Sequence, residues 1–420
     1  MSELSESVVT RRAAIVAFTL GTLFFGYAFI QRVSPSVMTN ELMRDFSVGG
    51  AALGSLSAFY FYAYASIQLP VGMLTDRFGP RKLMSVAAAL CALASLGFAF
   101  SYSLFGASVG RALIGGTVAF AFVGTLAIAG YWFKVAQYAM LAGVLQTVGM
   151  MGAIFGQAPL RQLVESIGWR GTMVVLAGAA LLLSVSIYML VPHRSPQQVS
   201  IKPRSSGLDG LKSVVSNGQT WWCALIGFGT AATMLGFAGL WAVPWLNSVH
   251  GYSIAEAAGI ASMLFLGWAI FAPLAGWASD RMGRRNSILV VGVLIELLAF
   301  TIVIYFTPTN TALLMALIFI TGAGGSSMTV CFSSVREHND IAYSSTSLGL
   351  MNMCVVGSGA VMQPLIGWLL DLNWAGAIVD GARTYSAGTY TTALSSLLVV
   401  NAFAFIGAIT LRETRCKQLK

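Results

Sequence analysis

Gly72-Met73-Leu74-Thr75-Asp76-Arg77-Phe78-Gly79-Pro80-Arg81-Lys82 is a short basic segment between two long apolar stretches. A second copy, Gly276-Trp277-Ala278-Ser279-Asp280-Arg281-Met282-Gly283-Arg284-Arg285, follows at an offset of 204 residues (280 − 76). The two copies share a glycine, an Asp-Arg pair, a second glycine and a final arginine at the same relative positions. A charged hairpin repeated half a chain apart in hydrophobic sequence indicates a duplicated membrane protein, with each copy joining the same two helices of its half.

The composition places the chain in a membrane. Of its 420 residues, 57% are hydrophobic and only 9% are charged, whereas about 25% of residues are charged in soluble domains. A soluble protein of this length could not bury so much apolar surface, so lipid must be the solvent. The apolar stretch after Arg11 and Arg12 is too long for a signal-peptide core, and we interpret it as a retained first span.

Hydropathy divides the chain into six spans (residues 1–192), a polar linker (193–218) and six further spans (219–420). The linker contains prolines, serines and basic residues, as expected for a cytoplasmic connection between two domains. The predicted spans begin near Ala13, Gly50, Leu83, Leu104, Tyr138, Gly171, Thr220, Ala255, Ser287, Thr311, Ser344 and Thr391.

The basic residues indicate the topology. With the N-terminus inside, most Lys and Arg residues fall in inner segments, and only Arg44, Arg161, Arg170 and Arg383 fall in outer loops. This asymmetry follows the positive-inside rule and places both termini in the cytoplasm. The formal charge of +9 is therefore explained by the basic residues of the inner segments, and no nucleic-acid partner is needed to explain it.

The G-x-L-x-D-R-x-G-x-R-[KR] pattern of residues 72–82 resembles the loop 2–3 signature of the major facilitator superfamily, and the second copy is a looser match. The resemblance covers essentially the whole chain. It implies an all-α membrane protein with twelve transmembrane helices in two pseudo-symmetric six-helix bundles and alternating access to a central solute site. It also implies gating roles for the residues that the hairpins share: Gly72, Asp76, Arg77, Gly79, Arg81, Gly276, Asp280, Arg281 and Gly283.

A second pair of related segments contains candidate solute ligands. Gly156–Leu160 and Val361–Leu365 each contain a glutamine and a proline, and the prolines follow the first glycine of each hairpin by 87 (159 − 72) and 88 (364 − 276) residues. In spans 5 and 11, two amide pairs are spaced eleven residues apart, which places each pair on one helical face. We interpret them as solute ligands at the repeat interface, with hydrogen bonding between helices as the alternative. The pairs are Gln146 with Gln157 and Asn352 with Gln363.

Arg32 lies late in span 1, where an arginine costs about 2.5–3.5 kcal/mol on insertion scales and usually faces a partner or a wet cavity. We predict that its planar guanidinium binds an anionic group of the solute. The alternative is snorkelling to the outer interface. Tyr27 and Gln31 share a neighbouring face of the same span, and both are also candidate solute ligands because the sequence does not show which face points inward.

Two aromatic pairs are candidates for the wall of a solute cavity. Tyr60 and Tyr64 lie one helical turn apart in span 2, and Trp241 and Trp245 do so in span 7. The alternative is core packing or an interfacial aromatic belt, which Trp245, near the outer end, fits better than Trp241 does. Tyr60, Tyr64 and Trp241 are retained as candidate solute contacts.

Arg111 and Glu296 are the candidates for proton coupling. Residues 111–115 match the R-x-x-x-G element of span 4, which in the superfamily is linked to proton coupling, and structural charge pairing is the alternative role for Arg111. Glu296 lies midway through span 9, where an acid is expected to be neutral or paired. It could therefore carry a proton, although ninth helices in this superfamily are usually peripheral.

The sequence contains no signature of an enzyme, a cofactor or a metal site. The five cysteines are scattered without CxxC spacing and are interpreted as small core residues. The three histidines form no cluster with acids or cysteines, and neither a nucleophile elbow nor a phosphate-binding loop occurs. We expect a monomer in a lipid bilayer, without metal or cofactor, that acts on a small-molecule solute and is driven by the proton gradient.

These features predict a secondary active transporter that imports a small polar solute across a bacterial inner membrane by proton symport. Tyr27–Pro35, Glu41–Phe46 and Leu53–Tyr60 are similar to the proteobacterial intraphagosomal amino-acid transporter branch, which implies an amino acid or a related carboxylate-bearing nutrient. The alternative is efflux of a drug, siderophore or metabolite by proton antiport, which would favour an acid deep in span 1 or 4, and neither span has one. A membrane receptor that does not transport would not need the amide pairs.

By resemblance, Asp76 and Arg77 belong to a cytoplasmic charge latch, with Asp76 against the positive N-terminal end of span 11. We expect Asp76→Asn to leave solute affinity nearly intact and to slow or bias turnover. Binding constants and uptake rates measured on the same preparation check this. A normal transport rate in the variant would show that the Asp76 carboxylate has no role in gating.

Overall fold

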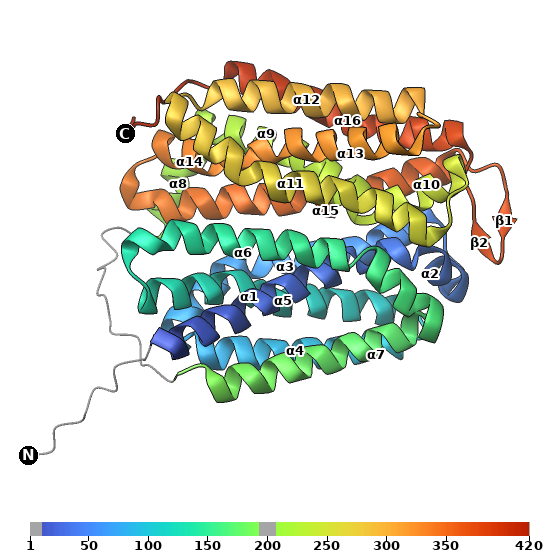
Figure 1. Cartoon of the computed structure of the whole chain (residues 1–420), viewed down its shortest axis with the longest axis horizontal. Coiled ribbons are helices and arrows are strands. Elements are labelled where there is room, and N and C mark those ends of the chain that lie inside the picture. The colour runs from blue at the N-terminus through green and yellow to red at the C-terminus, as the bar shows by residue number, and fades with distance from the viewer. Residues whose placement is uncertain (1–10, 193–206, 420) are drawn as a thin grey trace, which may run out of the picture.

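The computed structural model describes residues 11–192 and 207–419, which form a bundle of long helices with one small β-hairpin (Figure 1). Helices dominate because a chain in lipid must satisfy its backbone N–H and C=O groups internally. Among the described residues, ten helices are long and apolar enough to cross a membrane, and Met140–Phe155 is a shorter apolar helix. A further helix, Gly50–Phe78, has 29 residues. All twelve predicted spans are therefore helical, which confirms the predicted fold class.

The N-terminal half forms one layer of the molecule, drawn in blue to green in Figure 1. Its elements are α1 (Arg11–Val33), η1 (Ser34–Val37), α2 (Thr39–Phe46), α3 (Gly50–Phe78), α4 (Pro80–Ala99), α5 (Leu104–Trp132), α6 (Val135–Phe155) and α7 (Ala158–Leu190).

The C-terminal half forms the second layer, drawn in yellow-green to red. Its helical elements are α8 (Gly207–Val215), α9 (Gly218–Ala232), the π-helix η2 (Thr233–Trp241), α10 (Ala242–His250), α11 (Ile254–Met282), α12 (Asn286–Phe306), α13 (Thr311–Gly325), η3 (Ser326–Met328), α14 (Thr329–His338), η4 (Ile341–Tyr343), α15 (Ser344–Leu372) and α16 (Ala387–Thr410).

The connection between spans 5 and 6 differs from the prediction. Helix α6 ends at Phe155, and Gln157 is the non-helical residue that precedes α7, with φ −100° and ψ −112°. Pro159 lies in the first turn of α7, where a proline is tolerated because its missing N–H would have no helical partner. Gln157 therefore does not share a helical face with Gln146. Helix α7 contains a break at Gly168 (φ 75°, ψ 164°), and the helix that continues from Trp169 begins close to the predicted start of span 6 at Gly171.

Connections between the spans contain structure that the span prediction did not include, such as α2 between α1 and α3. In the linker, residues 193–206 lie outside the described part of the chain, and Gly207–Val215 forms the short helix α8. Between α15 and α16, the strands β1 (Ile378–Val379) and β2 (Ala382–Arg383) form an antiparallel hairpin. Its two-residue turn, Asp380-Gly381, has positive φ at both residues, as an Asp-Gly hairpin turn requires.

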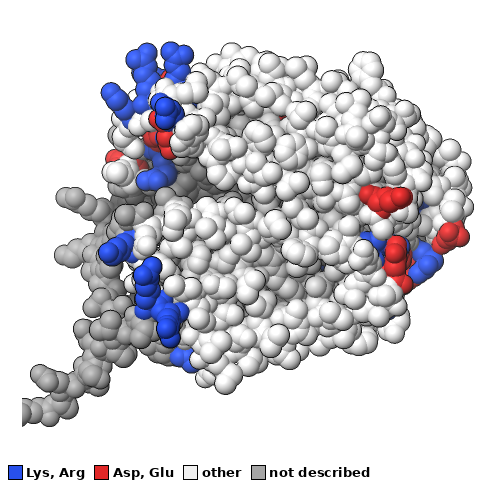
Figure 2. Space-filling model, in the orientation of Figure 1, with Lys and Arg blue, Asp and Glu red and all other residues white. Residues whose placement is uncertain are grey.

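The charged side chains gather at the two ends of the molecule, and the surface between them is uncharged (Figure 2). The described chain begins and ends at one of these ends, here called the basic end. Lys and Arg predominate at this end in Figure 2. At the opposite end, where Figure 1 places α2 and the β-hairpin, acids pair with arginines, among them Glu41, Asp45 and Asp371. The uncharged surface between the ends has many exposed large apolar side chains, as expected for a face in contact with lipid.

Helices α3 and α15 form the main contact between the two halves. Glycines allow their backbones to touch near the opposite end. A methyl group on Gly54 would lie 2.4 Å from the carbonyl oxygen of Gln363, and one on Gly367 would lie 2.1 Å from that of Gly50. Such close backbone approach is the role of small residues where membrane helices cross.

Helices α1 and α6 approach each other closely through glycines as well, and this contact provides a test of the packing. A methyl group on Gly152 would lie 2.1 Å from the carbonyl oxygen of Gly26, whereas one on Gly143, on the same helix, would have nothing within 4 Å. Overpacking of this kind costs about 1–3 kcal/mol. We expect Gly152→Ala to lower the melting temperature of the purified protein by several degrees and Gly143→Ala to leave it unchanged. Equal melting temperatures for the two variants would contradict the described contact.

Candidate functional site

Arg32, in the last turn of α1, lies against a group of aromatic rings. Its guanidinium carbon is 4.2 Å from the ring centroid of Phe29, 5.2 Å from that of Tyr64 and 5.8 Å from that of Tyr60. The two tyrosines, one turn apart on α3, are stacked with their centroids 6.1 Å apart. Arg32 is buried and its Nε has no hydrogen-bond partner. Snorkelling does not fit this placement, and cation–π contacts partly compensate the charge.

Arg111, in the first half of α5, is a second buried guanidinium beside the same tyrosine. It lies 5.0 Å from the ring centroid of Tyr60 and donates one hydrogen bond, 2.8 Å long, to the carbonyl oxygen of Gln31. Its Nε and one terminal nitrogen have no partner. Among the described residues, every ion pair involves arginines other than Arg32 and Arg111. The N-terminal half therefore holds two buried cations without a counter-ion.

Tyr27 and Gln31 point into the N-terminal bundle. The Tyr27 hydroxyl donates to the carbonyl oxygen of Leu176 on α7 (3.1 Å), and the Gln31 amide donates to Tyr27 (2.5 Å) and to Ser95 on α4 (3.0 Å). These bonds tie α1 to α4 and α7. The structure thus brings Arg32, Tyr60, Tyr64 and Arg111 together and places Tyr27 and Gln31 on a different face of α1.

Of the four predicted amide side chains, two form hydrogen bonds to η2 and two have no hydrogen-bond partner among the described residues. Gln157 donates to the carbonyl oxygen of Ala238 (3.1 Å), and Gln363 donates to that of Leu235 (2.7 Å), so both bind η2. Both amides thus donate to backbone carbonyl groups of the π-helix, one from each half of the molecule. Gln146 is exposed on α6 and Asn352 is half-buried on α15, and neither side chain has a hydrogen-bond partner among the described residues.

The two predicted tryptophans are both fully buried. Trp241, the last residue of η2, donates to the carbonyl oxygen of Gln363 (3.1 Å). The ring of Trp245 packs edge-on against Phe237, 5.5 Å away, and His250, 5.0 Å away. Assignment of Trp245 to an interfacial belt is therefore wrong, because its side chain lies inside the C-terminal half.

At the opposite end, Asp371 joins the two halves of the molecule. The carboxylate at the end of α15 accepts hydrogen bonds from the backbone N–H groups of Gly50 (3.0 Å) and Ala51 (2.9 Å), which begin α3. It also accepts from Tyr385 (2.6 Å) and pairs with Arg383 (3.2 Å). Burial, together with the contact to Asp371, raises the pKa of Tyr385, so its hydroxyl remains a donor. A carboxylate at a helix N-terminus is stabilised by the free N–H groups and the helix dipole.

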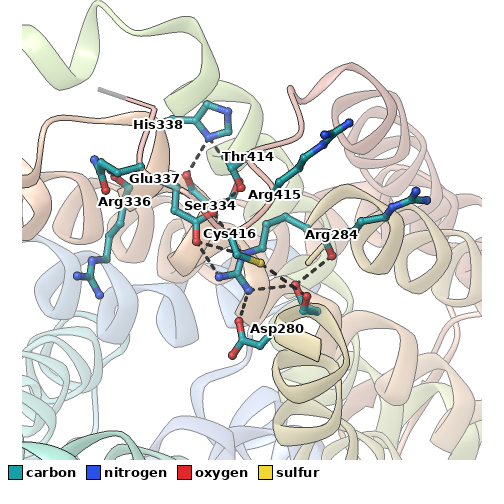
Figure 3. A network of polar contacts seen from close by, with 12 residues as sticks. Asp280, Arg284, Ser334, Arg336, Glu337, His338, Thr414, Arg415 and Cys416 are labelled. Atoms are coloured by element: carbon teal, nitrogen blue, oxygen red, sulfur yellow. Dashed lines mark hydrogen bonds and ion pairs between the residues drawn. The ribbon is translucent and has the colours of Figure 1, made fainter. Parts of the chain in front are cut away.

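At the basic end, Arg285 holds the second hairpin in a polar network (Figure 3). Its guanidinium pairs with Asp280 (2.6 Å) and with Glu337 of α14 (2.7 Å), and it also donates to Ser279 (3.0 Å). The gating prediction named Asp280, which this network includes, but it did not name Arg285 or Glu337. The final arginine shared by the two hairpins, Arg81 and Arg285, was the available sequence signal for Arg285.

The C-terminal segment closes the same network. The Glu413 carboxylate accepts from the backbone N–H groups of Arg285 (2.9 Å) and Asn286 (3.0 Å) at the start of α12. Burial opposes its ionisation, but these and further backbone hydrogen bonds outweigh burial and hold the pKa of Glu413 below its usual value. Thr414 hydrogen-bonds to Glu337. The sequence offered no periodic signal for this tail, because its contacts are made by single residues after the last helix.

The remaining hairpin residues have separate positions. Arg81 donates to the carbonyl oxygen of Tyr188 (2.9 Å), while Arg77 lies over the ring of Phe78 and Arg281 over that of Trp277. Gly79 and Gly283 have positive φ, 76° and 61°, where their helices end, and a methyl group on Gly276 would meet nothing within 4 Å. The surroundings of Gly72 and Asp76 lie outside the described part of the structure, so the predicted latch stays a prediction.

The twelve-helix, two-layer fold, with buried charges among its helices, defines a polytopic membrane transporter. The chain belongs to the Major Facilitator Superfamily, whose family model matches residues 18–336. Among the described residues, no group of three or more His, Cys, Asp or Glu side chains could hold a metal ion.

Curated relatives are similar over most of their length. A probable sulfoacetate transporter of Cupriavidus necator is 24% identical over 83% of this chain and 85% of that protein. A probable galactarate/D-glucarate transporter of Escherichia coli is 22% identical over 95% and 96%. A gentisate transporter of Corynebacterium glutamicum is 24% identical over 86% and 83%. The relatives are transporters, in agreement with the expectation that the chain is not an enzyme.

Solved structures share the fold. An inward-facing, unoccupied bacterial homologue of the human lysosomal transporter Spinster superposes with a TM-score of 0.76 at 16% identity, covering 96% of this chain and 98% of that one. The nucleoside transporter NupG, as a D323A mutant, has a TM-score of 0.73 at 14% identity, covering 94% and 98%.

The Asp371 contact yields a prediction about the opposite end of the molecule, where α3 and α15 touch. Asp371→Asn removes a charge from the N-terminus of α3 and weakens the hydrogen bonds to Gly50 and Ala51, a change worth about 0.5–2 kcal/mol. We expect this end to open more often, by about 2- to 30-fold. The measure is the rate at which a polar maleimide labels Ser36→Cys, a buried position beside Gln157, in a chain whose native cysteines are replaced by serine.

The matched control for this experiment is Asp380→Asn. Asp380 is an exposed acid in the neighbouring hairpin turn, and its φ of 50° is tolerated by asparagine. The control should label at the parent rate. Equal labelling of the Asp371→Asn and parent proteins would show that Asp371 does not hold this end closed.

Proposed function

We propose that the protein is a secondary active transporter that imports a small organic anion with a carboxylate or sulfonate group across a bacterial inner membrane by alternating access. The observation that carries the proposal is the pair of buried guanidinium groups, Arg32 and Arg111, beside Tyr60. A buried cation without a partner is costly, and a bound anion would remove that cost. The unpartnered nitrogens of both arginines are available as donors to it.

The chemistry of the site favours an oxyanion. A guanidinium presents parallel N–H donors that match the oxygens of a carboxylate or sulfonate, and such charge-assisted bonds are about twice as strong as neutral ones. The stacked rings of Tyr60 and Tyr64 would line one wall. The named solutes of the relatives, which include sulfoacetate, D-glucarate and gentisate, are organic anions and support this class for the present chain.

An amino acid, the narrower class suggested by the sequence, fits the site less well. Its ammonium group needs an anionic or strongly polar acceptor. Of the helices that form the site, α1 and α5 contain no Asp or Glu, and the acid of α3, Asp76, lies two residues before the end of that helix (78 − 76). We therefore propose a solute that has no cationic group. The free amides of Gln146 and Asn352 are proposed to contact its polar, uncharged part.

In this proposal, the two ends of the molecule open and close in turn to admit and release the solute. We place the basic end in the cytoplasm, by the positive-inside rule, so that Asp371 and Gln157 close the external side. Among the described residues, the hydrogen bonds between the two halves are those of Gly50, Ala51 and Gln157, all on that side. Symport with protons makes import the net direction, because the proton-motive force drives protons inward.

Ligand binding by purified protein tests the proposal. A thermal-shift screen would compare sulfoacetate, D-glucarate and gentisate with serine and glutamate, since a ligand that binds only the folded state raises the melting temperature. We expect one of the organic anions to stabilise the protein. Arg32→Ala should lower the affinity for that ligand by about 30-fold or more, because losing a buried charge pair costs about 2 kcal/mol or more.

Two further variants sharpen the result. Arg32→Lys keeps the charge but loses the planar fork, so we expect intermediate affinity. Arg44→Ala removes an exposed arginine that pairs with Asp45 at the opposite end and should bind as the parent does. An anion that binds equally well to the parent and to Arg32→Ala would overturn the proposed site.

A further inference from the structure

Glu296 is an isolated acid in the middle of a membrane-spanning helix. It lies ten residues from each end of α12 (296 − 286 and 306 − 296) and is buried. Every other Asp or Glu in the described helices lies close to a helix end or, for Glu165, to the break in α7 at Gly168. In the middle of an apolar layer, an ionised carboxylate without a cation is expensive, so such an acid is either paired or neutral.

The surroundings of Glu296 are shaped for a carboxyl group. A methyl group on Gly325 of α13 would lie 3.2 Å from the Glu296 carboxyl carbon and from its Oε2, so the glycine leaves room for the acid. The same methyl group would lie 3.1 Å from Nε1 of Trp268 on α11, which borders the space. Gly324 packs directly on the Glu296 backbone, where a methyl group would approach the amide nitrogen to 2.6 Å.

The polar groups beside the carboxyl are neutral and incompletely bonded. The carboxyl faces Asn401 of α16 and Thr233, the first residue of η2. Asn401 Nδ2 donates to Thr233 Oγ1 at 2.8 Å. Glu296 Oε2 and Asn401 Oδ1 are both buried and both without a partner. A protonated carboxyl is a donor and an amide oxygen is an acceptor, so a proton on Glu296 would provide the partner that Asn401 Oδ1 lacks.

No charged group faces this cluster among the described residues. Helix α16 contributes Asn401, η2 contributes Thr233 and α11 contributes Trp268, while α13 presents glycines. From η3, Ser327 packs on Gly292, one turn before Glu296. Helix α14 meets α12 at the basic end, where Glu337 pairs with Arg285, eleven residues before Glu296 (296 − 285). Glu296 forms none of the ion pairs of the described residues.

We propose that Glu296 binds the proton that drives transport and that Asn401 transmits its protonation state to η2. In the described conformation the proton bonds Glu296 to Asn401 Oδ1, and Asn401 Nδ2 donates to Thr233. When the proton leaves to water, the amide of Asn401 turns over. Its Nδ2 then donates to the carboxylate, and the Thr233 hydroxyl donates to Oδ1. One proton is released from the carboxyl oxygen, two hydrogen bonds are exchanged for two others, and no other covalent bond is broken.

The proton site connects to the closed end through η2. Thr233 begins this π-helix, and the carbonyl groups of Leu235 and Ala238, farther along it, accept from Gln363 and Gln157. Gln157 belongs to the other half of the molecule. Reversing the hydrogen bond at Thr233 therefore acts on the element that holds the two halves together. A proton that binds one conformation more tightly than the other shifts the equilibrium between them by that difference.

Infrared spectroscopy tests the proton site without any solute. In protein reconstituted in liposomes, a protonated carboxyl in a dry site gives a carbonyl stretch separate from that of carboxylates. We expect this band at neutral pH in the parent protein and its loss in Glu296→Gln. Asn401→Leu should shift the band, because the hydrogen-bond acceptor is gone. Glu256→Gln, which changes an exposed acid at the start of α11, should leave the band unchanged.

Transport measurements test the coupling of solute uptake to proton binding at Glu296. This test rests on the proposed function. With the membrane potential clamped, one coupled proton supports up to about tenfold accumulation of radiolabelled sulfoacetate per pH unit of gradient, because both ratios represent the same free energy. We expect Glu296→Gln to abolish this accumulation while sulfoacetate binding and exchange persist. Asn401→Leu should alter the pH profile of uptake more than the affinity.

The two experiments separate the possible failures. If sulfoacetate does not bind the parent protein, the transport experiment cannot be done with this solute. The infrared band then tests by itself whether Glu296 holds the proton. If the band remains in Glu296→Gln, or if the variant still accumulates sulfoacetate in response to the pH gradient, the proton site is wrong. A poorly folded Glu296→Gln protein leaves Asn401→Leu as the deciding variant, and an unshifted band in that variant would overturn the proposed contact.

Discussion

A charge in the hydrocarbon layer must be paired, neutralised or in contact with a ligand, and this constraint organises the interior of the protein. Arg32 and Arg111 lie buried beside the ring of Tyr60 and have no carboxylate partner among the described residues. Glu296 is a buried acid without a cation, in the other half. The buried cations thus lie in the N-terminal half, where an anion is proposed to bind. The buried acid lies in the C-terminal half, where a proton is proposed to bind.

The π-helix η2 connects these two regions. It receives the amides of Gln157 and Gln363, one from each half, and it begins at Thr233 beside Asn401. Glutamines that the sequence suggested as solute ligands are engaged in this conformation in holding η2. An amide that binds a backbone carbonyl in one state is free to bind something else when that contact opens, so solute binding by Gln157 and Gln363 stays a prediction for a conformation in which these bonds are broken.

Much of the fold was predictable because its signals are repeated and periodic. The duplicated hairpin and the lengths of the apolar runs predicted twelve spans, and the spans are helical. The position of Gln157 was not predictable from helical spacing, because the chain leaves α6 at Phe155 and the eleven-residue rule applies only within one helix. Asp371 and Glu413 were missed because each acts as a single residue on the start of a helix distant in sequence. The Asp-Gly turn of the β-hairpin was a local signal that could have been used.

The glycine contact between α3 and α15 has a mechanical consequence. The backbones touch at Gly54, close to one end of α3, and the helix continues for 24 residues to Phe78 (78 − 54). At about 1.5 Å per residue, this arm is roughly 36 Å long, so a tilt of about 10° around the contact would move its far end by about 6 Å. A pivot near one end acts as a lever with unequal arms. A change of hydrogen bonding at Gly50 and Ala51 that tilts α3 would therefore displace its far end, at the basic end, much more than its near end.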